Sequence, residues 1–354
     1  MKGWISFHPV DLEFFEGIVG SLVCGEKVNP ERYLEAALRV RRASWEVAGY
    51  KRALLDALEQ AEPPPPPSEG TVWDKVRTRL ERFDHRPPAV ARLARQHIEP
   101  DLHLDGRPFL IAERSTERVC EFADHYLDAQ DERAVAALAR EQLARLDKVL
   151  AEEVEPVEVQ APSAEMAYRS ELLGDLKALH DLGRAARESE HWATSHEPAL
   201  AVLERELPWR AAYLHSRAVP FWVARDVDGL DSVCSAAGVN APSFLIPARP
   251  LFAAVGEAFP GVRDSLQLEL SEERQVGGFV APGDVSELRA FLAAEGAAII
   301  RAATRHGEGP ACELLLRKIR ECAAYAERHG AGYLEASGIL PHGPEPRPAE
   351  DELY

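Results

Sequence analysis

The residues best suited to carry chemistry lie between positions 188 and 215. Glu188 and His191 are three positions apart, the Glu-x-x-His spacing that places two metal ligands on one helix face in di-iron bundles. His196 and His215 follow, and zinc and iron bind imidazole nitrogens and carboxylate oxygens. We therefore predict a candidate metal site at Glu188, His191, His196 and His215. A di-iron centre would need a second Glu-x-x-His pair, which the chain lacks.

The same region is rich in aromatic residues, and it lies where we expect two domains to meet. An aromatic pocket with a few polar groups is typical of small-molecule sites, but core packing at a domain junction explains the same composition. Elsewhere, Glu121 and His125 share a helix face at four-residue spacing, which is equally typical of ordinary surface pairs. The sequence leaves the identity of any cofactor undetermined.

Common enzyme motifs are absent. The chain has no Gly-x-Ser-x-Gly elbow, Walker phosphate loop, Gly-x-Gly-x-x-Gly fingerprint or His-Glu-x-x-His helix, which excludes the most easily recognised enzymes but not those whose residues meet only in space. The five cysteines are widely spaced and form no Cys-x-x-Cys. We expect them to be reduced and mostly buried.

The charge is strongly acidic: 59 Asp and Glu stand against 41 Lys and Arg, a formal net charge of -18. Such a surface disfavours nucleic acid and anionic membranes, because both require basic surfaces, and it suits either solubility or a basic protein partner. No apolar run approaches the roughly 20 residues of a membrane span, and no signal peptide is recognisable. We expect a cytoplasmic protein.

Several segments share one layout, in which a short apolar run and a polar or proline break precede an apolar pattern of helical period. Phe109 to Ile111 and Phe221 to Val223 are two such runs, and each predicts a buried strand. Ser115 and Asp284 stand where a helix N-cap is needed. The repetition fits either internal duplication or ordinary strand-to-helix junctions.

Longer patterns predict helices over Asn29 to Gln60 and Glu132 to Glu153, and a further helix that opens at Pro310 with a buried stripe through Cys312 and Cys322. The alternating "SLQLEL" segment and the following "QVGGFV" predict an antiparallel hairpin. Strands are also predicted at 244–246 and near Tyr333. The sequence therefore predicts a helix-rich α+β fold whose C-terminal part holds a mixed sheet of four or five strands covered by helices.

A length of 354 residues favours two domains. We expect a helix-rich domain over residues 1–155 with a proline-rich spacer at 62–70, an α+β domain over 163–343, and an acidic tail at 344–354. The leading functional hypothesis is a non-catalytic acidic interaction protein, such as an inhibitor or immunity-like factor, that binds a basic partner. The alternative is a metal-dependent enzyme or metal-binding protein with its site at the domain junction. A structural subunit of a larger assembly is a third possibility, and the oligomeric state stays open.

Overall fold

The fold is organised around one antiparallel sheet. A computed structural model of the chain describes residues 4–60, 106–146, 148, 150–156, 165–225, 228–266, 268, 270 and 275–339. Five strands lie in the order β2-β1-β5-β4-β3, and every neighbouring pair is antiparallel. They are β1 (Trp4–Val10), β2 (Trp222–Arg225), β3 (Ile246–Pro247), β4 (Gln275–Val280) and β5 (Gly332–Ser337).

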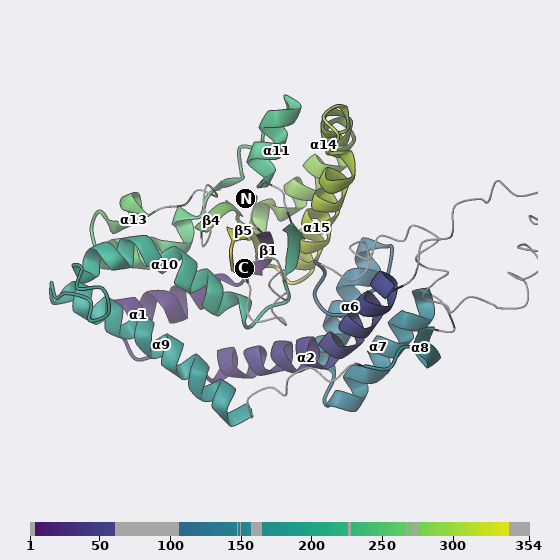
Figure 1. The fold of residues 1–354 in the computed structure, drawn as a ribbon. Coiled ribbons are helices and arrows are strands. Elements are labelled where there is room, and N and C mark those ends of the chain that lie inside the picture. The colour runs from purple at the N-terminus through teal and green to yellow at the C-terminus, as the bar shows by residue number, and fades with distance from the viewer. Residues whose placement is uncertain are drawn as a thin grey trace, which may run out of the picture.

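Helices cover both faces of the sheet. Phe7, Trp222 and Tyr333 from the strands join a core cluster with α6 (Thr116–Asp128), α7 (Glu132–Leu146), α11 (Leu230–Ala237), α14 (Val285–Arg305) and α15 (Gly309–Arg328). Phe279 and Leu334 join a second cluster with the π-helix η1 (Phe14–Gly20), α9 (Glu165–Arg187), α10 (Ala199–Ser216), α12 (Ala253–Ala258) and α13 (Val262–Ser265). Figure 1 shows these two groups on either side of the strands.

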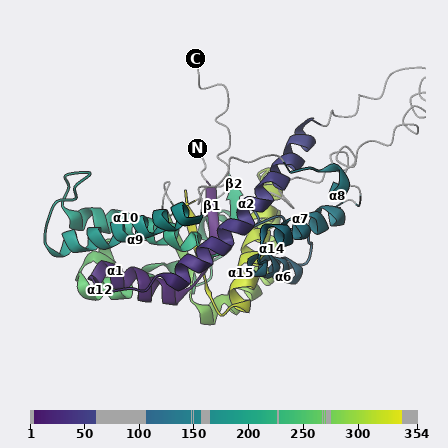
Figure 2. The same cartoon turned by 90° about the horizontal axis from the view of Figure 1, so that it is seen from below.

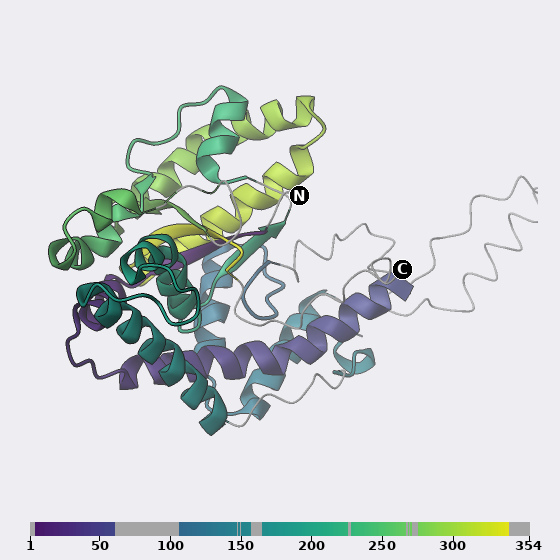
Figure 3. The same cartoon turned by 60° about the vertical axis from the view of Figure 1, so that its left-hand side comes forward.

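One long helix spans both groups. α2 (Glu31–Gln60) contributes Tyr33, Leu34 and Ala37 to the second cluster and Val47 and Leu54 to the first. Figures 2 and 3 show it running lengthwise past the helices of both groups. The remaining short helices are α1 (Ser21–Cys24), α8 (Leu150–Glu153) and the 3-10 turns η2 (Arg249–Phe252) and η3 (Pro282–Asp284).

The expected mixed sheet is wrong, because all five strands are antiparallel. The chain leaves β4, runs out along α14 and returns along the similarly long α15 before it enters β5. A single crossover helix would carry the chain to the far end of the sheet and make the strands parallel. The two-helix excursion brings it back to the end where β4 finished, so β5 runs in the opposite direction.

The helix-rich α+β class is confirmed, but two sequential domains are not. β1, from the first residues of the chain, pairs with β2 and β5, and both core clusters combine early and late segments. The proline-rich spacer at 62–70 and the tail at 344–354 lie outside the described residues. Within the described residues, no helix combines the length and apolar character needed to cross a bilayer.

The strand predictions near residues 222, 246, 275 and 333 are confirmed by β2, β3, β4 and β5. The predicted strand at Phe109 to Ile111 is wrong: Phe109 and Leu110 form bends, Ile111 lies outside any regular element, and Phe109 has a left-handed φ of 58°. Their buried backbone is satisfied by side chains instead of a neighbouring strand. Tyr126 donates its hydroxyl to the Leu110 carbonyl at 2.8 Å, and the Ala112 amide donates to Gln142 Oε1 at 2.8 Å.

The predicted hairpin is also wrong. Leu266 and Leu268 are buried but lie outside any strand. β4 pairs with β5 along one edge and, at Gly278 and Phe279, with β3 along the other. A bulge interrupts the β4–β5 ladder between Val276 and Phe279. A Cβ on the intervening Gly277 would lie 2.4 Å from the Leu270 side chain, so glycine permits this close approach.

The helix predictions hold with adjustments at their ends. Asn29 to Gln60 corresponds to α2, whereas Glu132 to Glu153 divides into α7 and α8. Ser115 caps α6 by accepting from the Arg118 amide, but the Asp284 side chain makes no such bond at the start of α14. Cys312 and Cys322 are buried on α15 as expected.

A buried ion pair joins the loop before α6 to α15. The side chains of Arg107 and Glu321 are each 2% exposed. Arg107 donates to both carboxylate oxygens of Glu321, with Nε at 2.9 Å, and to the carbonyls of Ile111 and Glu113 at 2.9 and 2.8 Å. Trp222 Nε1 donates to the same carboxylate at 3.1 Å. These hydrogen bonds offset the free-energy cost of removing both charged side chains from water.

A second buried carboxyl, Glu335, lies on β5 against the start of α11. Its oxygens accept from the Tyr333 hydroxyl at 2.9 Å and from the Leu230 amide at 3.3 Å. Burial raises the pKa of Glu335 to about 7, although both hydrogen bonds favour the ionised form. Near neutral pH, this carboxyl therefore titrates inside the folded protein.

Removing one partner of the Arg107–Glu321 pair is expected to destabilise the fold strongly. Arg107→Met leaves a buried, uncompensated carboxylate, and such losses cost about 3–5 kcal/mol. The control is Arg32→Met, which breaks an ion pair with Glu13 whose side chains are 80% and 71% exposed and which should cost less than about 1 kcal/mol. Chemical denaturation followed by tryptophan fluorescence measures both values. Equal losses in the two variants would contradict the structural role of the buried pair.

The titration of Glu335 predicts a pH dependence of stability. The folded carboxyl keeps its proton up to about pH 7, whereas the ordinary value is 4.5. The unfolded chain therefore binds fewer protons in this interval, so this group makes the free energy of unfolding fall as the pH rises from 4.5 to 7. Glu335→Gln cannot titrate, and its stability relative to wild type should increase across this range. Unfolding curves at several pH values test this, and parallel profiles for the two proteins would refute it.

Candidate ligand-binding pocket

The structure places three of the four predicted metal ligands on the surface. Glu188 directly follows α9 and pairs with Arg184 at 2.7 Å. His191 and His196 lie in the exposed turn between α9 and α10. This turn is ordered by backbone contacts, including an isolated bridge between His191 and Pro198.

The fourth predicted ligand, His215, lies in the core on α10 and is 1% exposed. Its Nε2 accepts from the Asp11 amide at 3.1 Å, and its ring lies 5.3 and 5.2 Å from the rings of Phe14 and Phe15. Burial lowers the pKa of His215 to about 3, so the ring is neutral at physiological pH. Its contacts are those of a packing residue.

The predicted metal ligands are not brought together. Among the described residues, no group of three or more His, Cys, Asp or Glu side chains is placed to hold a metal ion. The aromatic residues of the same region are also divided between two environments. Trp222 is buried in the first cluster, whereas Trp209 stacks on Tyr213 at 5.5 Å and packs against the second.

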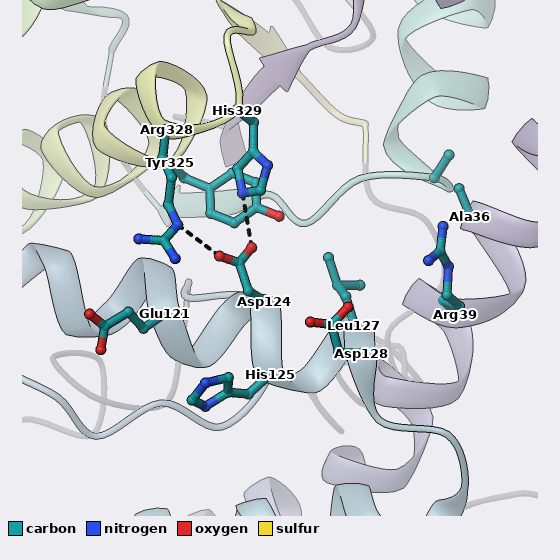
Figure 4. A pocket seen from close by; sticks show the side chains of 11 residues that line it. Ala36, Arg39, Glu121, Asp124, His125, Leu127, Asp128, Tyr325, Arg328 and His329 are labelled. Carbon is teal, nitrogen blue, oxygen red and sulfur yellow. Dashed lines mark hydrogen bonds and ion pairs between the residues drawn. The ribbon is translucent and has the colours of Figure 1, made fainter.

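A different group of polar side chains lines an open pocket between α2, α6 and α15, with a volume of about 580 Å³. Figure 4 shows Asp124 directed toward Arg328 and His329, with Arg39 across from them on α2, whereas Glu121 and His125 point away from this group. The charged and titratable ones are Arg39 from α2; Glu121, Asp124, His125 and Asp128 from α6; and Tyr325, Arg328 and His329 from the end of α15.

Asp124 organises one wall of this pocket. Its Oδ1 lies 2.9 Å from His329 Nε2, and its Oδ2 accepts from Arg328 Nε at 2.9 Å. The Asp124 side chain is 18% exposed. Burial alone would raise the pKa of Asp124, but hydrogen bonds and charge from His329 and Arg328 outweigh it and lower the pKa below its usual value. At neutral pH the carboxylate is ionised and holds two cationic or hydrogen-bonding groups side by side.

Tyr325 forms the inner surface behind His329. The two rings are 4.3 Å apart between centroids, and Tyr325 is 5% exposed. Burial, followed by the nearby Asp124 charge, raises the pKa of Tyr325, so its hydroxyl stays protonated. The imidazole of His329 is thus held by a carboxylate at its edge and an aromatic ring at its face, while 42% of its side chain stays exposed.

The local sequence of α6 explains its contribution. Ser115 caps the helix, and Val119, Phe122, Ala123 and Tyr126 form its buried face. The helical period then leaves Glu121, Asp124, His125 and Asp128 on the sides that border the pocket. These residues include the Glu121 and His125 pair, whose four-residue spacing is equally typical of ordinary surface pairs.

Arg39 approaches from the opposite wall, on an exposed position of α2. Within the described residues no carboxylate forms an ion pair with it. The helix pattern after Pro310 predicts only the buried stripe of α15 and does not indicate Arg328 or His329. The polar face of α6 is the only sequence pattern that indicates this pocket. The residues that Asp124 on this face contacts, such as His329, lie about 200 positions further along the chain.

Comparison with protein-family models, curated proteins and solved structures finds no match to this chain.

Proposed function

We propose that the protein binds a small molecule carrying a carboxylate or phosphate group in the pocket between α2, α6 and α15. The observation that carries this proposal is the position of Arg39, which lines the pocket with no carboxylate partner among the described residues. A planar guanidinium with five donors is well suited to recognise such anions.

The opposite wall supports the same ligand chemistry. Asp124 holds Arg328 and His329 in fixed positions, so their unused donors are oriented before the ligand enters, which lowers the entropy cost of binding. The volume of about 580 Å³ lies within the range of small-molecule sites. Preorganised donors on one side and an unpaired guanidinium on the other are what an acidic ligand group requires.

A second candidate function is recognition of a basic protein partner. The observation in its favour is the formal net charge of -18, with 59 acidic against 41 basic residues. Long-range attraction of this kind raises association rates and is screened by salt. This electrostatic attraction would act over the whole surface of the protein and does not depend on the pocket.

The small-molecule proposal predicts that Arg39→Gln weakens binding of an acidic ligand. Isothermal titration calorimetry with a panel of short carboxylates and inorganic phosphate should show a Kd at least about tenfold higher for the variant, as expected for the loss of one charge-assisted contact. Arg133→Gln is a matched control, because Arg133 is exposed on α7 and does not line the pocket. No binding by the unmodified protein, or equal weakening in both variants, would reject the proposal.

The basic-partner candidate predicts binding that depends on salt. Poly-L-lysine should bind the protein at an ionic strength of about 0.01 M and be released near 1 M, because the Debye length falls from about 30 Å to about 3 Å. Analytical ultracentrifugation at both concentrations measures this. Failure to associate at low salt would exclude the candidate.

A further inference from the structure

The pocket carries opposite charges on facing walls. Glu121, Asp124 and Asp128 follow one another along one side of α6, whereas Arg39 stands on α2. Glu121 pairs with Arg118 at 2.6 Å, and Asp124 pairs with Arg328. Among the described residues, no cation lies within ion-pair distance of the Asp128 carboxylate. Asp128 and Arg39 are therefore an uncompensated anion and an uncompensated cation on the same pocket.

The helix that carries Asp128 adds to the negative potential at that wall. Asp128 is the last residue of α6, and the C-terminal end of a helix carries a partial negative charge of roughly half an elementary charge. Cations are favoured at such an end and carboxylates are not. α15 satisfies this rule with Arg328 in its last turn, whereas α6 has His125 in its last turn but ends on the Asp128 carboxylate at the pocket border. A cationic group on a ligand would balance the negative charge of Asp128 and of the helix end.

A simple anion fits the pocket less well than a dipolar molecule does. An anion that reaches Arg39 also meets the Asp128 carboxylate, which has no ion-pair partner among the described residues, and the net charge of -18 of the chain, both of which repel it. A molecule that carries an ammonium as well as an acidic group has no net charge to be repelled, and each of its ends finds an opposite charge. The volume of about 580 Å³ has room for a molecule of this kind.

We propose that the ligand of this pocket is a zwitterion, an amino acid or a short peptide, whose carboxylate contacts Arg39 and whose ammonium contacts Asp128 at the end of α6. This inference rests on the proposed function, because it assumes that Arg39 receives an acidic group. It adds the second, cationic group and assigns the residue that recognises it.

The test compares linear ω-amino acids, from glycine to 6-aminohexanoate, with carboxylic acids and alkylamines of the same chain lengths, using calorimetry on the full chain. At the best length, the amino acid should bind at least about tenfold more tightly than either single-charge analogue. Asp128→Asn should bring the amino acid close to the affinity of the carboxylic acid and leave the carboxylic acid unweakened. Asp264→Asn, an exposed position on α13 outside the pocket, should change neither.

The outcomes separate the two proposals. Carboxylic acids that bind as tightly as the amino acids, with no effect of Asp128→Asn, would overturn the zwitterion inference and leave the anion-binding function in place. Alkylamines that bind as tightly as the amino acids would overturn both, because Arg39 would then have no role. A protein that binds none of the three series would likewise overturn both.

Discussion

The buried pairing of Arg107 with Glu321 is the constraint on which the arrangement around α15 depends. Two charges that are each 2% exposed are stable only where their hydrogen bonds are made with good geometry. Here the Arg107 guanidinium donates hydrogen bonds to Glu321 and to two backbone carbonyls, and the Trp222 indole donates a further hydrogen bond to the Glu321 carboxylate. The loop before α6, the strand β2 and the helix α15 must therefore meet at one point, which limits how far any of them can shift.

The same ion pair also fixes the pocket wall that α15 forms. Tyr325 and Arg328 follow Glu321 by four and seven positions, so all three lie on one side of the helix. The ring of Tyr325 lies 5.7 Å from that of Trp222 and 4.3 Å from that of His329. Cys120 on α6 contacts the Glu321 carbonyl at 3.9 Å. The same few contacts thus set the position of α15 against α6, and with it the distance at which Asp124 meets Arg328 and His329.

Local patterns predicted most of the secondary structure, because the burial that produces them acts within one segment. The strands β2, β4 and β5 and the helices α2 and α15 follow directly from apolar runs and periods. Phe109 to Ile111 shows the limit. Its apolar run resembles a strand, but its Leu110 and Ile111 carbonyls accept from Tyr126 and Arg107, and the next amide, of Ala112, donates to Gln142. No pattern inside the run reveals that these side chains replace a partner strand.

The candidate site shows the same limit more strongly. The sequence predicts one site from Glu188, His191, His196 and His215, but the first three share an exposed turn, whereas His215 belongs to the core. Asp124 and His329 are 205 positions apart and lie 2.9 Å from each other. Their meeting depends on the packing of α6 on α15, which is a property of the whole fold rather than of either helix.

Among the described histidines and carboxylic acids, those with the most strongly shifted pKa values lie in the core and not in the pocket. Strongly shifted pKa values are often used to locate functional sites, but here His8, His215 and Glu335 owe theirs first to burial in the core. Their partners are backbone groups and neighbouring side chains of the fold, such as Ser6 for His8. The charged side chains of the proposed pocket are partly exposed, so water moderates their interactions. A binding site that must exchange ligand with solvent keeps its charges accessible, and its signature is then the unequal pairing of those charges on facing walls.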